Sequence, residues 1–256
     1  MKARRQFCTW CAAALLLFAG AVRAADDAAA LIKQGDVFDR KVQPAEALTL
    51  YLAVEKSTPE SVPLLLKIAR QYRHLAAEVI LVGEKIRLFE ISKSYALRAV
   101  KLAPNEAEAH LSVAITYAKM LPLLDSKAKV EAIHKVKAAV DKSLALDAGQ
   151  DLAWHVLGCW HRRLAEVGAI RRTAAKVLYG EIPEGSSEEA VRCFQKAIKL
   201  NPSRLSHYVE MGIAYAFQGN TAKARESLNK GLAMPSVDAG DPASKELARE
   251  VLSSLK

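Results

Sequence analysis

The residues whose side chains are best suited to metal binding or catalysis lie between Trp154 and His161. His155 and Cys159 are four residues apart, so a helix places both on one face, and His161 follows two residues later. Imidazole and thiolate groups at this spacing can hold zinc or copper. A zinc site needs at least three protein ligands, and no third ligand with suitable spacing accompanies the pair. We therefore predict no metal and no cofactor, with a metal at His155 and Cys159 as the remote alternative.

The rest of the sequence offers no convincing residues for acid–base or nucleophilic catalysis. Glu188 and Glu189 stand side by side, but they precede a helix that is expected to begin near Ala190. Carboxylates in a first helical turn are explained by the helix dipole. The sequence contains no nucleophile elbow, no Walker loop and no dinucleotide fingerprint. We predict that the protein is not an enzyme.

The elements that position these residues repeat along the chain with a period near 34 residues. The composition suits helices, because 51% of the 256 residues are apolar and aromatics are only 6%. Two units of 34 residues fit at the ends, and three longer units with insertions lie between them. The five units are 28–61, 62–106, 107–150, 151–204 and 205–238. A capping helix is expected over 241–256, with Asp241 as its cap and Pro242 in its first turn.

A small residue recurs at the eighth position of every unit: Gly35, Ala69, Ala114, Gly158 and Gly212. Two antiparallel helices can approach closely only where a small side chain separates them. In this the chain resembles the tetratricopeptide-repeat (TPR) family, whose repeat is a pair of antiparallel helices. The expected fold class is therefore all-α, a TPR α-solenoid with lengthened helix pairs in the central repeats. An alanine-rich bundle with coincidental spacing is the alternative.

A narrower resemblance involves the long fourth unit. The segments 154–160 (WHVLGCW), 171–178 (RRTAAKVL) and 189–197 (EAVRCFQKA) follow one another in order, preceded by 93–99 and 137–146. They resemble the TPR domain of the regulator of microtubule dynamics family over roughly residues 85–240. That family consists of eukaryotic microtubule-associated or organelle-contact proteins, some of which bind lipid. The resemblance implies the architecture. It does not imply a microtubule function, because an exported chain meets no microtubules.

The first 24 residues are typical of a signal peptide. Lys2, Arg4 and Arg5 precede an apolar run of eleven residues, 12–22, and the segment 22–24 offers a cleavage site before Ala25. We expect an exported protein, periplasmic or secreted and of bacterial type. An uncleaved segment that anchors the chain to the membrane is the alternative. Cleavage lowers the formal net charge from +9 to +5, too small an excess to predict nucleic-acid binding.

The binding surface of a TPR protein lies on the concave side, where the first helices of the repeats line up. The expected face is an apolar strip bordered by basic groups at 70, 73, 162 and 163, which we expect to accept anions. Its residues are Leu66, Arg70, Arg73, His74, Leu111, Ile115, Lys119, Leu152, His155, Cys159, Arg162, Arg163, Val209, Ile213 and Phe217. This combination suits a protein or peptide partner with acidic residues. An anionic, lipid-like amphiphile or a membrane surface is the alternative, and these residues could also be an ordinary solvated face.

Two further features leave alternatives open. Residues 76–91 are unusually apolar for a repeat linker, and they either lengthen both helices or form a lobe for acyl chains or a partner helix. Cys159 and Cys193 remain after cleavage, and they are either a disulfide or two small buried residues.

Overall fold

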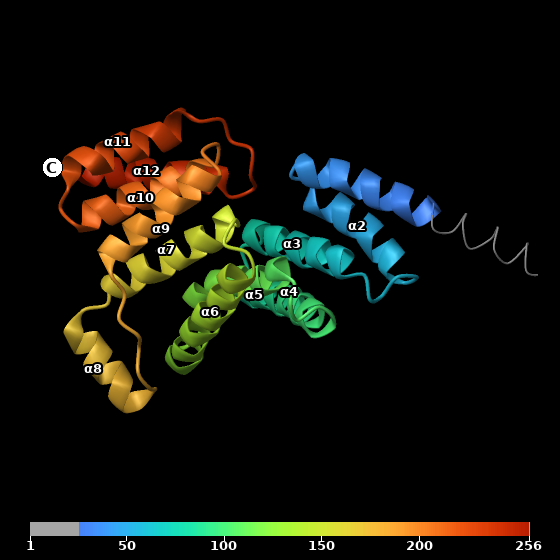
Figure 1. Cartoon of the computed structure of the whole chain (residues 1–256), viewed down its shortest axis with the longest axis horizontal. Coiled ribbons are helices and arrows are strands. Elements are labelled where there is room, and N and C mark those ends of the chain that lie inside the picture. Colours follow the sequence, from blue (N-terminus) through green and yellow to red (C-terminus); the bar gives the residue numbers. More distant parts are fainter. Residues whose placement is uncertain (1–25, 256) are drawn as a thin grey trace, which may run out of the picture.

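The computed structural model describes residues 26–255, which form helices joined by short turns (Figure 1). The predicted signal peptide lies outside the described residues. Successive helices form five antiparallel pairs: 26–40 with α2 (Pro44–Glu55), α3 (Val62–Glu78) with α4 (Val82–Leu102), α5 (Ala107–Met120) with α6 (Ser126–Leu146), α7 (Asp151–Ala165) with α9 (Ser187–Leu200), and α10 (Leu205–Phe217) with α11 (Thr221–Ala233). Three elements lie outside this pairing: η1 (Leu121–Leu123), α8 (Ala169–Leu178) and α12 (Asp241–Ser254).

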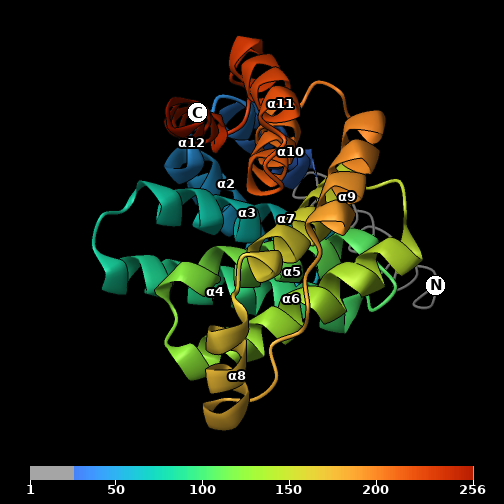
Figure 2. The same cartoon turned by 90° about the vertical axis from the view of Figure 1, so that its left-hand side faces the viewer.

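The pairs stack into an arch. In Figure 1, α3 and α7 lie toward the inner side of the arch, and α4 and α6 lie on its outer side. The view from the side in Figure 2 shows α5 and α6 crossing beneath α3 and α7. No described residue lies in a β-strand. The prediction of an all-α solenoid of stacked helix pairs is confirmed.

Close approach within the pairs follows from the small residues at the eighth position. A Cβ atom on Gly35 would lie 2.5 Å from Cε1 of Tyr51, and one on Gly212 would lie 2.6 Å from Cγ of Leu228. Such distances are shorter than any real packing contact, so only glycine fits without a shift of its neighbours. Ala69, the corresponding residue of the α3–α4 pair, is completely buried.

The first two insertions lengthen helices, as the sequence predicts. Helices α4 and α6 each have 21 residues. Leu88 and Phe89 of the lengthened α4 are buried against Met120, so this part of the insertion belongs to the core. The third insertion differs, because it forms the separate helix α8 between α7 and α9.

Helix α12 covers the end of the stack. Ala248 is completely buried, and Val251, Leu252 and Leu255 pack on the cluster that contains Leu205. The expectation that Asp241 is the N-cap is wrong. Asp241 is the first helical residue, and its carboxylate accepts hydrogen bonds from the backbone N–H groups of Val237 and Asp238, both at 2.8 Å.

None of the helices between residues 26 and 255 is both long enough and apolar enough to cross a bilayer.

Candidate binding face

The first helices of four successive pairs, α3, α5, α7 and α10, form a continuous surface that we call the inner face. Helix α5 contacts both α3 and α7, and α7 also contacts α10. All fifteen residues predicted to bind a partner belong to these four helices. Their exposure divides them into two groups.

Five of the predicted residues are not accessible, and their placement on the surface is a wrong expectation. Leu66, Leu111 and Val209 are buried in apolar clusters between helices. Arg73 and Arg162 are each only 7% exposed, because their guanidinium groups turn toward neighbouring helices. Position within a repeat determines which side of a helix a residue occupies, but not how deeply the next helix covers it.

The other ten residues keep some exposure. Lys119 and Arg163 are exposed, and Phe217 is 50% exposed at the end of α10. The remaining seven are partly buried: Arg70, His74, Ile115, Leu152, His155, Cys159 and Ile213. An apolar surface with basic groups beside it is therefore present, although it is smaller than the sequence indicates.

Three cations from successive first helices lie close enough to influence one another: the buried Arg73 of α3 and the exposed Lys119 of α5 and Arg163 of α7. The side chain of Lys119 reaches solvent, but its pKa is lowered. The largest cause is desolvation by the surrounding helices, and the charges of Arg73 and Arg163 lower the pKa further. Among the described residues, none of the three forms a salt bridge with a carboxylate. Adjacent like charges without counter-ions attract anions.

Arg73 is the most unusual member of this cluster. Its Nη1 donates hydrogen bonds to Ser112 Oγ at 2.9 Å and Thr116 Oγ1 at 3.3 Å, both on α5. Burial and the nearby Arg70 lower the pKa of Arg73 to about 9. Hydroxyl groups orient the guanidinium but do not neutralise it, so Arg73 adds a buried positive charge close to the exposed Lys119.

The two other arginines of the predicted anion-accepting rim are paired. Arg70 contacts Asp39 at 3.3 Å and Glu108 at 3.6 Å. Arg162 donates from Nε to Glu210 at 2.8 Å and from Nη1 to Glu166 at 2.6 Å. These ion pairs neutralise carboxylates that would otherwise oppose an anion. The cations without a carboxylate partner are therefore Arg73, Lys119 and Arg163, which we call the cation cluster.

His74 lies beside the cation cluster. Its Nδ1 is buried and has no hydrogen-bond partner in the described structure. Burial, followed by the charge of Arg73, lowers the pKa of His74 to about 4. The imidazole is therefore neutral at physiological pH.

His155 and Cys159 belong to a hydrogen-bonded chain that also contains His207 and Asp151. Cys159 Sγ is 3.6 Å from His155 Nε2, His155 Nδ1 is 3.0 Å from His207 Nδ1, and His207 Nε2 is 3.0 Å from Asp151 Oδ2. One tautomer of each ring satisfies every step, with the thiol donating to His155, His155 to His207, and His207 to the carboxylate. The chain therefore joins α7 to α10.

These four hydrogen-bonded residues have a structural role. Burial, followed by the charge of Glu210, raises the pKa of the Cys159 thiol far above its usual range, so the nucleophilic thiolate is disfavoured. Burial lowers the pKa of His155. Across residues 26–255, no three histidine, cysteine or acidic side chains are grouped as metal ligands. Cys159 and Cys193 are both free thiols.

Sequence reasoning missed the partners of these groups. Asp151 and His207 are 56 residues apart, and Arg73 and Ser112 are 39 apart. Only the repeat register could have indicated them, because equivalent positions of successive first helices become neighbours in a solenoid.

A stack of antiparallel helix pairs with an exposed inner face defines the class of TPR solenoids, which act as protein-interaction scaffolds. The structure is similar to that of a thermophilic TPR protein from Thermus thermophilus. The two superpose with a TM-score of 0.65 over 89% of this chain and 98% of the other, at 14% sequence identity. At this identity the likeness concerns the fold.

Within that class, residues 31–256 match the family described as Regulator of microtubule dynamics protein 1-3, and the chain belongs to this family. It is 26% identical to Regulator of microtubule dynamics protein 1 of Caenorhabditis elegans over 160 residues, which are 62% of this chain and 71% of the relative. It is also 26% identical to the mouse protein of the same name over 221 residues, 85% of this chain and 72% of the relative.

Proposed function

We propose that the protein is a non-catalytic scaffold that binds an extended acidic segment of a protein partner along its inner face. The observation that carries this proposal is the cation cluster. Arg73, Lys119 and Arg163 come from three successive first helices, and none has a carboxylate counter-ion within the described chain.

The surroundings of the cluster favour a peptide over a free inorganic anion. Ile115 and Leu152 are partly exposed apolar neighbours on α5 and α7, and Phe217 is half exposed on α10. An extended chain places alternate side chains on one side, so acidic residues can meet the cations while apolar residues meet this strip. Charge-assisted hydrogen bonds from arginine would add specificity.

The compartment belongs to the same proposal. A basic start, an apolar run of eleven residues and a cleavage site before Ala25 support export to the periplasm or the medium. Edman or mass-spectrometric determination of the N-terminus of the protein made by its own cell tests this part. A chain that still begins at Met1 would instead favour the anchored alternative.

The binding proposal is tested with a fluorescent peptide of alternating glutamate and leucine, titrated by anisotropy at several salt concentrations. We expect salt-sensitive binding. The double variant Lys119→Glu with Arg163→Glu should lose affinity about tenfold or more, because each reversal replaces attraction by repulsion. A matched control, Lys199→Glu with Lys230→Glu, makes the same charge change at exposed positions of α9 and α11.

Equal losses in both double variants would reduce the effect to net charge and contradict an inner-face site. Native mass spectrometry of the purified protein supplies a second arm. Stoichiometric lipid that disappears in the Lys119→Glu and Arg163→Glu variant would replace the peptide by an anionic amphiphile as occupant.

A further inference from the structure

A second surface, separate from the inner face, is defined by exposed apolar side chains. The five most exposed large apolar side chains of the described residues are Ile80, Ile170, Val177, Leu81 and Leu178, with exposed fractions of 92, 87, 79, 73 and 66%. All five lie in two insertions, between α3 and α4 and in α8. Apolar side chains gathered on one element, as the three of α8 are, mark a contact surface.

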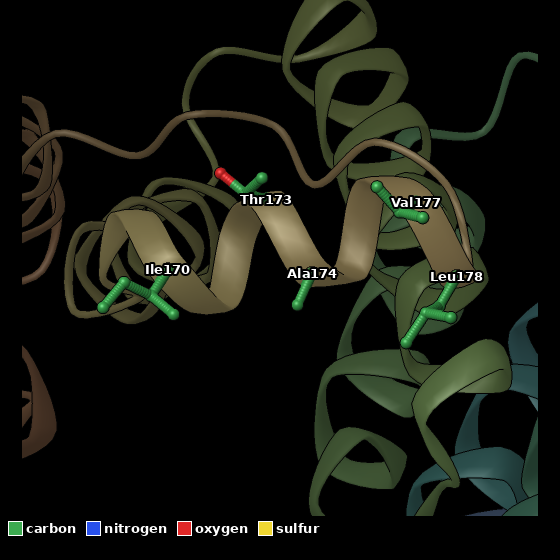
Figure 3. Close-up of a pocket in the computed structure, with 5 residues that line it drawn as sticks. All are labelled: Ile170, Thr173, Ala174, Val177 and Leu178. Carbon is green, nitrogen blue, oxygen red and sulfur yellow. The ribbon is translucent and has the colours of Figure 1, made fainter.

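Helix α8 presents this surface. Ile170, Thr173, Ala174, Val177 and Leu178 are all exposed and together line a shallow, open hollow. Figure 3 shows these five side chains spread along α8, with no other helix lying over them. Their spacing is that of one face of a helix. An apolar helix face is ordinarily turned toward a core, so α8 is reversed relative to the other helices.

The polar residues of α8 explain this orientation. Arg172, on the opposite side, donates from Nη1 to the carbonyls of Ile182 at 3.1 Å and Pro183 at 2.6 Å. Its Nη2 donates to the carbonyls of Leu164 at 2.9 Å and Val167 at 3.3 Å. One guanidinium therefore ties α8 to the end of α7 and to the segment that returns to α9. The apolar face is held outward.

Basic residues flank the apolar face. At 100° per residue, Arg171 lies at one edge of the face and Lys176 at the other. Arg171 is exposed and forms no salt bridge within the described chain, while Lys176 is 3.5 Å from Glu181 and 64% exposed. Helix α8 contains no acidic residue. An apolar face between two cationic edges is the pattern of a helix that lies in the headgroup region of a membrane.

Each of the two insertions follows the first helix of its pair, α3 or α7. The segment after α8 contacts α6, where His134 Nε2 lies 2.9 Å from the carbonyl oxygen of Glu181. Leu123 and Leu124, just before α6, pack on the cluster that contains Phe89 of α4. Figure 2 shows α8 at the bottom and the turn from α3 to α4 at the left, and in Figure 1 α8 lies well to the left of α3 and α4, so the two apolar segments are separate.

We propose that α8 docks the protein on an anionic lipid surface, with the helix lying in the interface and its apolar face turned toward the lipid. Ten residues give a helix about 15 Å long, which is half the thickness of a bilayer core, so α8 can lie in the interface but cannot span it. A second copy of the chain is a poorer occupant, because pairing two α8 faces would bring Arg171 and Lys176 against cations of the same kind. This docking is independent of the inner-face proposal.

The test is flotation of the chain, as its producing cell processes it, with vesicles of phosphatidylcholine alone or mixed with phosphatidylglycerol. We expect binding to the anionic vesicles. Ile170→Ser with Val177→Ser should weaken it at least tenfold, because each apolar side chain contributes roughly 1.5 to 3 kcal/mol when fully buried. Arg171→Gln with Lys176→Gln should weaken it about thirtyfold, at roughly 1 kcal/mol per charge.

The matched control is Val237→Ser with Leu200→Ser, which removes two exposed apolar side chains elsewhere, 60 and 45% exposed, and should bind as wild type does. Circular dichroism establishes that all variants fold. Equal flotation of wild type and the Ile170 and Val177 variant, or equal binding to neutral and anionic vesicles, would overturn the proposal. So would a dimer in sedimentation velocity that this variant alone dissolves, because the occupant would then be a second copy.

Discussion

Gly158 of α7 lies directly against the ring of Phe194 of α9: a Cβ atom on Gly158 would be 2.7 Å from Cε1 and 2.9 Å from Cδ1 of that ring. Phe194 is completely buried, so the ring has no free space into which it can turn. The contact fixes the distance between the two helices that flank the long third insertion.

Gly158→Ala should therefore destabilise the protein. Overpacking a filled core costs roughly 1 to 3 kcal/mol, which outweighs the gain of about 0.5 to 1 kcal/mol that alanine brings to a helix. Urea denaturation followed by circular dichroism measures the free energy of unfolding.

Gly83 provides the control, because it lies in α4 and a Cβ there would meet nothing within 4 Å. Gly83→Ala should leave the stability unchanged or raise it slightly. If both variants gained stability, the close contact between Gly158 and Phe194 would not oppose a larger side chain at position 158.

This steric relationship explains why the fold could be predicted. A small residue is required wherever two helices nearly touch, and the requirement leaves a mark at Gly35, Ala69, Ala114, Gly158 and Gly212. Exposure is a different matter. The position of Arg73 on the inner side of α3 follows from the repeat, but its burial depends on Ser112 and Thr116 of the next pair. Such contacts arise only when the pairs stack.

Helix α8 shows the same limit. The spacing of Ile170, Ala174 and Val177 is visible in the sequence, but a separate helix with an apolar face was not predicted there. Whether that face turns inward or outward depends on the hydrogen bonds of Arg172 to four backbone carbonyls. Backbone geometry around an insertion cannot be read from residue types.

The free energy of unfolding should fall as the solution becomes acidic, and His74 should contribute. Burial lowers its pKa to about 4 in the folded chain, against about 6.5 when unfolded. Below pH 6.5 the unfolded chain then binds more protons than the folded one, so acid favours unfolding until the folded imidazole also titrates near pH 4. Urea denaturation at several pH values should show His74→Leu with a shallower slope, by about 1 kcal/mol per pH unit.

His74→Leu also removes the unpartnered buried Nδ1. At neutral pH the variant should therefore be at least as stable as wild type. An unchanged slope between pH 6.5 and 4 would mean that His74 is protonated in the folded protein and would contradict its burial.

Arg73→Met separates binding from stability. A buried guanidinium without a carboxylate is costly, and a methionine of similar length removes that cost, although Ser112 loses a hydrogen-bond donor. We expect a free energy of unfolding within about 1 kcal/mol of wild type. Affinity for the glutamate–leucine peptide should fall several-fold, because one of three cations is lost.

Calorimetry and the anisotropy titration measure these two effects. Lys33→Met, which removes an exposed cation from the helix over residues 26–40, is the control and should leave both unchanged. An Arg73→Met variant that is clearly less stable but binds the peptide with wild-type affinity would make Arg73 a structural residue only.

Arg172→Met should loosen α8 without unfolding the solenoid. The substitution leaves the carbonyls of Leu164, Val167, Ile182 and Pro183 without their common donor. The helix pairs do not depend on α8, whose apolar residues remain exposed in the wild type. Hydrogen exchange of residues 168–186 should therefore become faster, while the melting temperature changes little.

Arg171→Met, one residue earlier, alters an exposed side chain and should leave the exchange unchanged. Equal exchange in the two variants would mean that something other than Arg172 holds the apolar face of α8 outward.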